Sequence, residues 1–202
     1  MTARKAAPPP RPRGRPKSYD ADIALARATD LFWARGYSGT SMRDLSSTMK
    51  LVPKSLYAEF GDKESLFLSA IQLYIAQHRG RFQALQTEPL GLHRIRGYYE
   101  SFRDAPDRRG CLLVNSLGEG AVVPHQAAER IRDFFTWLES LYRRNLEVAA
   151  AEGTLCARAD VQQLAAALVV FDQGLAIAAR LTGQDRDLAS AALSLLACVS
   201  AQ

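Results

Sequence analysis

Cysteine is scarce in this chain, with only Cys111, Cys156 and Cys198 among 202 residues. Their odd number and wide spacing argue against a disulfide framework and against a cysteine-rich zinc site. The three histidines are equally isolated, so no metal-ligand cluster is expected, and no cofactor motif is visible. No nucleophile, base and orienting acid converge in the sequence, so we do not expect an enzyme.

Long apolar runs are also missing. None reaches the length of a membrane span, and the N-terminus lacks the hydrophobic region of a secretion signal. We therefore expect a cytoplasmic protein with no membrane partner. Strand-like alternation never extends beyond a few residues and no internal repeat is evident, which predicts an all-α fold.

Positive charge is concentrated at the N-terminus. The chain has a net charge of +5, and residues 1–17 hold six Lys or Arg and no acidic residue. The remainder has 20 basic against 21 acidic residues, so its net charge is −1. Prolines favour an extended, solvated segment here, so we expect a disordered basic arm. The arm suits a solubilising tail or, through Arg13 and Arg15 in "RPRGRPK", the DNA minor groove.

Short helices joined by tight turns follow the arm. A cap at Ser18 or Asp20 predicts a first helix, and a cap at Thr40 or Ser41 predicts a second. Pro53 is suited to the first position of a third helix. The second and third helices, of about two turns each and joined by a few residues, predict a helix-turn-helix.

A fourth helix begins after Asp62, and five more predict a C-terminal bundle. Their expected ranges are Leu92–Arg103, Arg108–Glu119, Pro124–Ala151, a segment starting at Val161, and Leu188–Val199. The last two carry more apolar surface than one chain can bury, so we expect a homodimer formed through them. The predicted organisation is an arm (1–17), a three-helix helix-turn-helix head (18–62) and a ligand-binding and dimerisation bundle (63–202), with about nine helices.

Two segments resemble the TetR family of transcriptional regulators. They are "ARATDLFWARGYSGTSMRDLSS" at 26–47 and "SLYAEFGDKESLF" at 55–67; "RRGCLLVNSLGEG" at 108–120 is similar to a segment of one large subgroup. The resemblance implies an all-α homodimer whose helix-turn-helix binds double-stranded DNA at a palindromic operator. It also implies a bundle that binds a small-molecule inducer of unknown identity, which releases the repressor from DNA without catalysis.

The resemblance places DNA contacts on and around the third helix, whose N-terminal end would enter the major groove. Tyr57 matches a family tyrosine that contacts phosphate, and Lys63 matches a family lysine that meets the DNA backbone. The N-terminus of the second helix is a natural phosphate site. The full predicted set is Thr40, Ser41, Arg43, Pro53, Lys54, Ser55, Tyr57, Lys63, Arg13 and Arg15. The alternative for each is a solvated surface residue.

Two residues in the turn depart from the family pattern. Lys50 stands where the family often has glycine, which costs up to about 1 kcal/mol if the position needs a positive φ. Val52 stands where Ser, Thr or Asn is usual, and valine caps a helix poorly. We expect these departures to affect the local turn and not the fold.

A ligand pocket is expected in the bundle. Asp172 and Gln173 interrupt the apolar eighth helix, and buried polar groups need partners, which a ligand or a second chain can supply. The predicted lining is Tyr98, Tyr99, Phe102, Cys111, Asn115, Glu119, Phe134, Trp137, Leu138, Asp172 and Gln173. The alternative for these residues is a plain core.

Cys111 has two interpretations. It lies near the start of the sixth helix beside Arg108 and Arg109, and both features lower the pKa of a thiol. A redox- or electrophile-sensing protein acting through Cys111 is therefore an alternative function, although free cysteine is more often inert core. A helical small-molecule-binding protein that merely contains a helix-turn-helix is another. The basic arm and "VPKSLYAEF" favour DNA binding over it.

Overall fold

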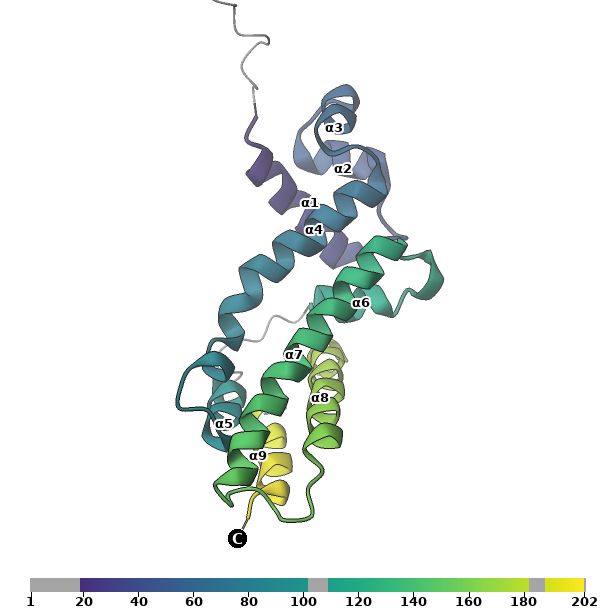
Figure 1. Ribbon diagram of the computed structural model, residues 1–202. Coiled ribbons are helices and arrows are strands. Elements are labelled where there is room, and N and C mark those ends of the chain that lie inside the picture. Colours follow the sequence, from purple (N-terminus) through teal and green to yellow (C-terminus); the bar gives the residue numbers. More distant parts are fainter. Residues whose placement is uncertain (1–18, 102–108, 182–187, 202) are drawn as a thin grey trace, which may run out of the picture.

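The computed structural model describes residues 19–101, 109–181 and 188–201 (Figure 1). Within these ranges the chain forms nine α-helices with short 3-10 turns, and the only extended pairing is an isolated bridge between Leu155 and Ser200. The predicted all-α class is confirmed. The predicted site residues Arg13, Arg15 and Phe102, and Arg108 beside Cys111, lie outside the described residues.

Three helices form the head, α1 (Ala21–Arg35), α2 (Met42–Met49) and α3 (Pro53–Phe60). The carboxylate of Asp20 caps α1 by accepting two backbone hydrogen bonds from its first turn. A capping box joins Ser41 and Asp44 at the start of α2. The predicted helix starts are confirmed, because side chains within three residues of each terminus satisfy its free N–H groups.

The turn between α2 and α3 is closed by backbone groups. Lys50 adopts the left-handed conformation, with φ of 57°, at the C-cap of α2. The Leu51 N–H then donates to the carbonyl of Ser46 at 3.1 Å. Val52 supplies no side-chain cap, but Pro53 at the start of α3 has no N–H that needs one. Both departures from the family pattern are therefore accommodated locally, at a cost of about 1 kcal/mol for Lys50.

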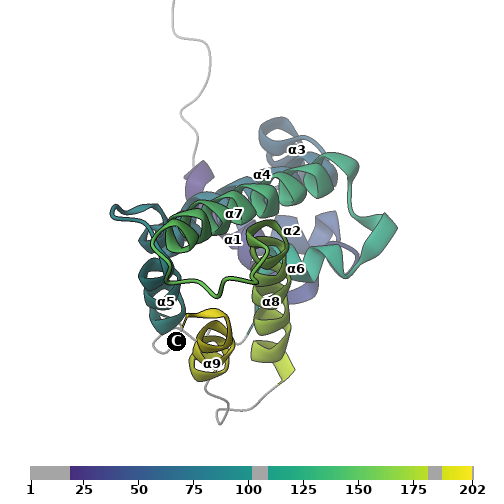
Figure 2. The same ribbon diagram turned by 60° about the horizontal axis from the view of Figure 1, so that its bottom comes forward.

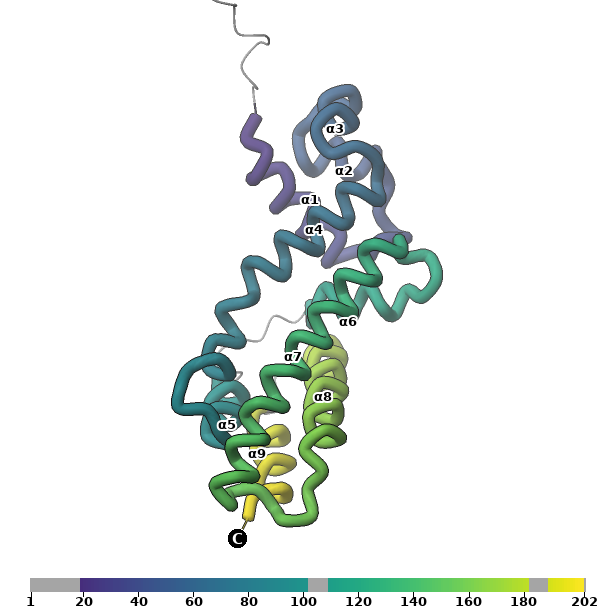
Figure 3. The backbone as a smooth tube through the Cα atoms, viewed as in Figure 1, coloured from purple at the N-terminus to yellow at the C-terminus, as the bar shows by residue number. Residues whose placement is uncertain are grey.

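A long helix, α4 (Lys63–His78), connects the head to the rest of the chain (Figure 3). It packs against α1 and, further along, against α7 (His125–Ala151). Phe67 on α4 is fully buried and meets Phe32 of α1 edge-to-face, with ring centroids 4.9 Å apart. The short helices of the head thus bury their core against α4, since helices of two turns are not stable alone.

Beyond α4 lies the body, which we define as residues 79–201. It contains η1 (Arg79–Phe82), η2 (Ala84–Gln86), α5 (Leu92–Glu100), α6 (Leu112–Leu117), η4 (Gly120–Val122), α7, α8 (Val161–Leu181) and α9 (Leu188–Val199). Viewed from the end of the molecule, α5, α7, α8 and α9 surround a common interior (Figure 2). Aromatic and aliphatic side chains from several of these elements fill it.

Two expected helix ranges need correction. The sixth helix, expected over Arg108–Glu119, spans only Leu112–Leu117. Glycines with positive φ lie on both sides of it, Gly110 at 73° and Gly120 at 68°, and they turn the chain out of the helical path. The fifth helix, expected to reach Arg103, is described to Glu100, beyond which Ser101 forms its C-cap.

The expectation that no apolar run reaches the length of a membrane span is wrong for the eighth helix. By length and composition, α8 is the one helix in the described ranges that could cross a membrane, and only 22% of its apolar window is buried. Val170, Ile177 and Leu181 are exposed on it, at 66%, 49% and 79%. One such helix is weak evidence for a membrane span, because an exposed apolar face equally fits a partner chain.

Candidate nucleic-acid interface and effector site

Helix α3 offers most of its surface to solvent. Leu56 is its one fully buried residue, and it anchors the helix to the head core. Pro53, Lys54 and Tyr57 are exposed, Tyr57 at 52%, and Ser55 is half-buried. A cation and a phenol hydroxyl therefore project from one short helix that the protein itself leaves uncovered. This is the chemistry that meets phosphates and base edges in a DNA groove.

Only some of the residues predicted to contact DNA at the N-terminus of α2 are available for such a contact. Arg43 is exposed. Ser41 is exposed as well, but its hydroxyl is engaged with Asp44 in the capping box, and this contact holds the pKa of the Asp44 carboxyl below its usual range. The predicted DNA contact of Thr40 is corrected, because this residue is 1% exposed and its hydroxyl donates to the Gly36 carbonyl at 2.7 Å. Thr40 thus shapes the loop before α2 and offers no free hydroxyl to DNA.

Lys63 stands at the first position of α4, between the head and the body. Its ammonium group lies 4.0 Å from the centroid of the Tyr37 ring, a cation–π contact. Tyr37 in turn lies against Phe67, with ring centroids 4.9 Å apart. Lys63 is half-buried, so its predicted DNA-backbone contact stays a prediction for a side chain that already has a structural partner.

Glu119 joins the body to the head. Its carboxylate accepts hydrogen bonds from the backbone N–H groups of Tyr37 and Ser38, both at 2.7 Å. Burial alone would raise the pKa of Glu119, but these hydrogen bonds and the charge of Lys63 outweigh it and hold the pKa below 4.5. Sequence reasoning placed Glu119 in the ligand pocket; the structure instead places it at the loop between α1 and α2.

Arg109 makes a second connection to the head. Its guanidinium donates to the Asp30 carboxylate at 2.9 Å and lies 3.7 Å from the centroid of the Trp33 ring. Both partners belong to α1. The segment just before α6 and the segment just after it therefore both contact the head. A shift of α6 would change these contacts with α1 and with the loop that leads to α2.

The predicted pocket residues on α5 and α8 do come together. Asp172 Oδ2 accepts a hydrogen bond from the Tyr142 hydroxyl at 2.5 Å and from the Tyr98 hydroxyl at 3.3 Å. The Tyr142 hydroxyl also lies 3.4 Å from that of Tyr99. Burial raises the pKa of Asp172 to about 7, although the tyrosine hydrogen bonds oppose the rise. We call Asp172, Tyr98, Tyr99 and Tyr142 the carboxylate–tyrosine cluster.

Tyr142 was not among the residues predicted to line the pocket. The signal that could have found it is the lone carboxylate in an apolar helix, which demands hydroxyl or N–H donors from the helices around it. Burial raises the pKa of Tyr142 well above its ordinary value, so its hydroxyl remains a donor across physiological pH. Gln173, the neighbour of Asp172, is half-buried.

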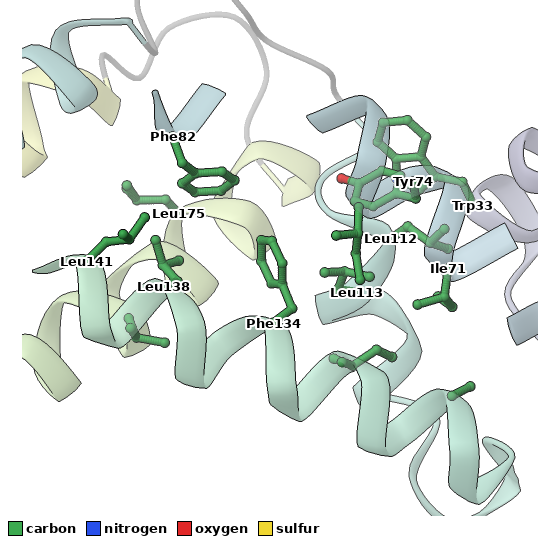
Figure 4. Close-up of a cluster of buried hydrophobic side chains, with 14 of the residues drawn as sticks. Trp33, Ile71, Tyr74, Phe82, Leu112, Leu113, Phe134, Leu138, Leu141 and Leu175 are labelled. Carbon is green, nitrogen blue, oxygen red and sulfur yellow. The ribbon is translucent and has the colours of Figure 1, made fainter. Parts of the chain in front are cut away.

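A second aromatic group lies where α4 and η1 meet α7 (Figure 4). Phe82 stacks with Tyr98 and meets Phe134 and Trp137 edge-to-face, with centroid distances of 5.5–5.6 Å. Leu138 is buried beside them. Phe134 and Trp137 also line a small surface pocket of about 110 Å³, together with Ile75, Arg79, Arg130 and Asp133. Phe82 thus connects this group to the carboxylate–tyrosine cluster.

Asn115 and Cys111 lie away from both aromatic groups. The Asn115 side chain bridges Arg109 and Arg180, donating to the carbonyl of the first and accepting from the guanidinium of the second. Cys111 is the N-cap of α6 and contacts Tyr74. Burial raises the pKa of the Cys111 thiol, which overturns the predicted lowering. This burial outweighs the hydrogen bonds of the thiol and the charge of Arg81, which act in the opposite direction. Among the described residues no group of three His, Cys, Asp or Glu could hold a metal.

Comparison with known proteins covers both parts of the chain. Residues 24–70 match the family of bacterial regulatory proteins, tetR family, and residues 91–195 match the tetracyclin repressor-like C-terminal domain. The HTH-type transcriptional repressor ComR of Escherichia coli (strain K12) is 30% identical over 174 residues, which cover 83% of each chain.

Solved structures share the fold. A cysteine mutant of the TetR family transcriptional regulator CifR, complexed with 26-bp double-stranded operator DNA, has 31% identity and a TM-score of 0.75, covering 92% of this chain and 100% of that one. The reduced form of E. coli NemR has a TM-score of 0.76 at 21% identity, over 89% and 96% of the two chains, and shows the fold alone. Both family domains match, and helix α3 is left uncovered for DNA. This chain therefore belongs to the TetR family and is a DNA-binding transcriptional regulator.

Proposed function

We propose that this regulator is a homodimeric repressor that binds a palindromic operator through two heads and is released when a small molecule binds in the body. The observation that carries the proposal is the uncovered face of α3, where Lys54 and Tyr57 project while Leu56 alone is fully buried. The operator complex of CifR and the repressor activity named for ComR support it. A two-fold dimer would read two half-sites related by the same symmetry.

The dimer would form through α8 and α9. Val170, Ile177 and Leu181 of α8 and Leu195 of α9 are large apolar side chains left exposed in the single chain. The other side of α8 already packs against α6 and α7, so a second chain is the natural cover for the exposed side. We place the regulator in the cytoplasm, where its DNA is, and keep the division into an arm (1–17), a DNA-binding head (18–62) and a ligand-binding and dimerisation bundle (63–202), which comprises α4 and the body.

The contacts around α6 would transmit a ligand-induced shift in the body to the DNA-binding head. Glu119 and Arg109 hold the head from either side of this helix, and Asn115 ties the helix to Arg180 near the end of α8. A ligand that shifts α8 against α7 would move α6 with it. The two heads would then change their separation and lose the half-site spacing that simultaneous binding needs.

Fluorescence anisotropy on DNA from upstream of the regulator's own gene would test the proposal. We expect the dimer to bind that fragment with at least about a thousandfold preference over scrambled DNA. Lys54→Ala and Tyr57→Phe should each weaken binding about tenfold and leave the melting temperature unchanged. The matched control is Arg96→Ala, an exposed cation on α5 far from the head, which should bind like the parent. A parent protein without preference for that fragment, or equal binding by all variants, would contradict the proposal.

A further inference from the structure

The carboxylate–tyrosine cluster contains an unusual residue for its position. Asp172 is the only acidic residue in α8, and the only other charged residue of that helix is Arg180, two turns away. The Arg180 guanidinium donates a hydrogen bond to Asn115, which lies outside the cluster. Part of the Asp172 residue borders solvent, while Tyr98, Tyr99 and Tyr142 around its carboxylate are buried.

The two oxygens of Asp172 have different surroundings. Oδ2 receives the hydroxyl groups of both Tyr142 and Tyr98. Oδ1 is shielded from solvent and has no hydrogen-bond partner among the described residues. A shielded acceptor without a donor destabilises the fold, and more so when it is charged. The fold therefore holds a carboxylate oxygen ready for a donor that the described part of the chain does not supply.

The residues that pack around the Asp172 carboxylate group form an aromatic cluster. Tyr98 and Tyr99 lie with ring centroids 5.2 Å apart, Tyr142 lies 6.1 Å from Tyr98, and Phe171 lies 6.2 Å from Tyr99. Aromatic faces attract cations, and a carboxylate at the same site adds a full opposite charge. A neutral hydroxyl or amide could donate a hydrogen bond to Oδ1. It carries no positive charge, however, so it would make no cation–π contact with the rings.

We propose that the effector of this regulator is an organic amine, whose protonated nitrogen pairs with Asp172 Oδ1 while its carbon skeleton packs against the tyrosine rings. This inference rests on the proposed effector site in the body and names the chemical class that the site accepts. It also predicts discrimination against acids of the same shape, because a second negative charge beside Asp172 would be repelled.

The pH dependence supports the same assignment. Burial raises the pKa of Asp172 to about 7, and an ammonium group binds only the ionised carboxylate well. The titratable groups that face Asp172 from the neighbouring described elements are Tyr98 and Tyr99 of α5 and Tyr142 of α7. Burial raises the pKa of all three, so they stay neutral at physiological pH. Amine affinity should therefore rise from pH 6 to pH 8 through the ionisation of Asp172 alone.

The test uses three soluble probes of matched shape: 2-phenylethylamine, 2-phenylethanol and phenylacetate. Binding to the DNA-free protein would be measured by calorimetry or ligand-observed NMR at pH 8, with probe concentrations up to about 10 mM, since molecules this small bind weakly. We expect the amine to bind on the order of tenfold more tightly than the alcohol, and phenylacetate to bind least. The amine should also lose affinity at pH 6, whereas the alcohol should not.

Two isosteric variants separate the site from other carboxylates. Asp172→Asn should abolish the preference for the amine and its pH dependence while retaining the alcohol. Asp133→Asn removes an exposed carboxylate from the small pocket between α4 and α7 and should behave like the parent. The proposal is overturned if the parent binds no amine at the highest concentration, if alcohol and amine bind equally, or if the preference survives in Asp172→Asn. The comparison of pH 6 with pH 8 needs no variant, so it decides the matter even if Asp172→Asn does not fold.

Operator release is measured separately and keeps the two proposals apart. If the amine binds through Asp172 but labelled operator DNA stays bound, the ligand class stands and the inducer role fails. If the protein never binds the operator, the repressor proposal fails while the amine measurements still decide this inference.

Discussion

The carboxylate of Glu119 accepts a 2.7 Å hydrogen bond from the backbone N–H of Tyr37, across 82 residues of sequence. The neighbouring N–H of Ser38 donates to the other oxygen at 2.7 Å. One side chain of the body thus satisfies two donors of the loop that precedes α2. Because α2 and α3 follow this loop directly, the position of the helix-turn-helix depends on a residue outside it.

Replacing Glu119 should loosen the head. Glu119→Ala removes the acceptor of two backbone donors at a partly buried site, so we expect the free energy of unfolding to fall by about 1–3 kcal/mol. Urea denaturation would measure the change. Glu129→Ala on α7 removes an exposed acid whose ion-pair partner among the described residues is His125. It is the control and should change stability by less than about 0.5 kcal/mol. Equal stability of the two variants would show that the Glu119 contact does not hold the head.

Gly36 should not tolerate a side chain. Its φ is 76°, and a Cβ atom there would lie 2.7 Å from Glu119 Oε1. Gly36→Ala should therefore destabilise the protein by about 1–3 kcal/mol, through backbone strain and displacement of Glu119. Gly97→Ala on α5 is the matched control, since nothing lies within 4 Å of its would-be Cβ. We expect it to stabilise by up to about 1 kcal/mol in thermal melts, because alanine favours the helix. Destabilisation by both variants to the same extent would contradict this reasoning.

Asp172 should make stability fall as pH rises. Its pKa is raised from the ordinary 3.8 to about 7, so the folded protein holds this proton more tightly than the unfolded chain does. The stabilising contribution is complete below pH 3.8 and is lost as pH rises through about 7. The parent should therefore lose about 2–4 kcal/mol relative to Asp172→Asn across that window. Urea unfolding at pH 4.5, 6 and 8 would measure the difference, and parallel curves for parent and variant would refute a raised pKa.

Cys111 should react slowly with thiol reagents. Burial raises its pKa, so little thiolate forms at neutral pH, whereas Cys156 and Cys198 are exposed in the single chain. We expect alkylation of Cys111 to be at least about tenfold slower than in the urea-unfolded protein. Mass spectrometry of peptides after timed iodoacetamide treatment would give each rate. Fast labelling of native Cys111, lost in Cys111→Ser, would instead favour a sensing role.

The N-terminal arm should supply much of the salt dependence of DNA binding. Residues 1–17 carry six cations and no acid, while the rest of the chain has a net charge of −1. Each neutralised phosphate adds about 0.9 to the slope of log affinity against log salt concentration, so removing residues 1–17 should flatten that slope by about two to five. The preference for operator over scrambled DNA should remain. Parallel slopes for the full and truncated chains would show that the arm does not contact DNA.

The sequence by itself determined the elements whose causes are local. Ser41 and Asp44 cap α2 because they lie three residues apart, and Pro53 begins α3 because its ring fits only there. The helix-turn-helix and the exposed Lys54 and Tyr57 follow from such short-range rules. The apolar composition of α8 is likewise local, although the full length of this apolar run was recognised only in the described helix.

Only the tertiary structure decided which of the chosen polar residues belong together. Glu119 was assigned to the pocket as a residue of the expected sixth helix, yet its partners are 81 and 82 residues away. Cys111 was expected to have a lowered pKa, but burial raises it. The guanidinium of Arg109, one of the two arginines invoked, is hydrogen-bonded to Asp30 of α1. The Tyr142 hydroxyl meets Asp172 only after α7 packs on α8. Electrostatic and hydrogen-bond energies depend on distance in space and on burial, and neither can be read from spacing along the chain.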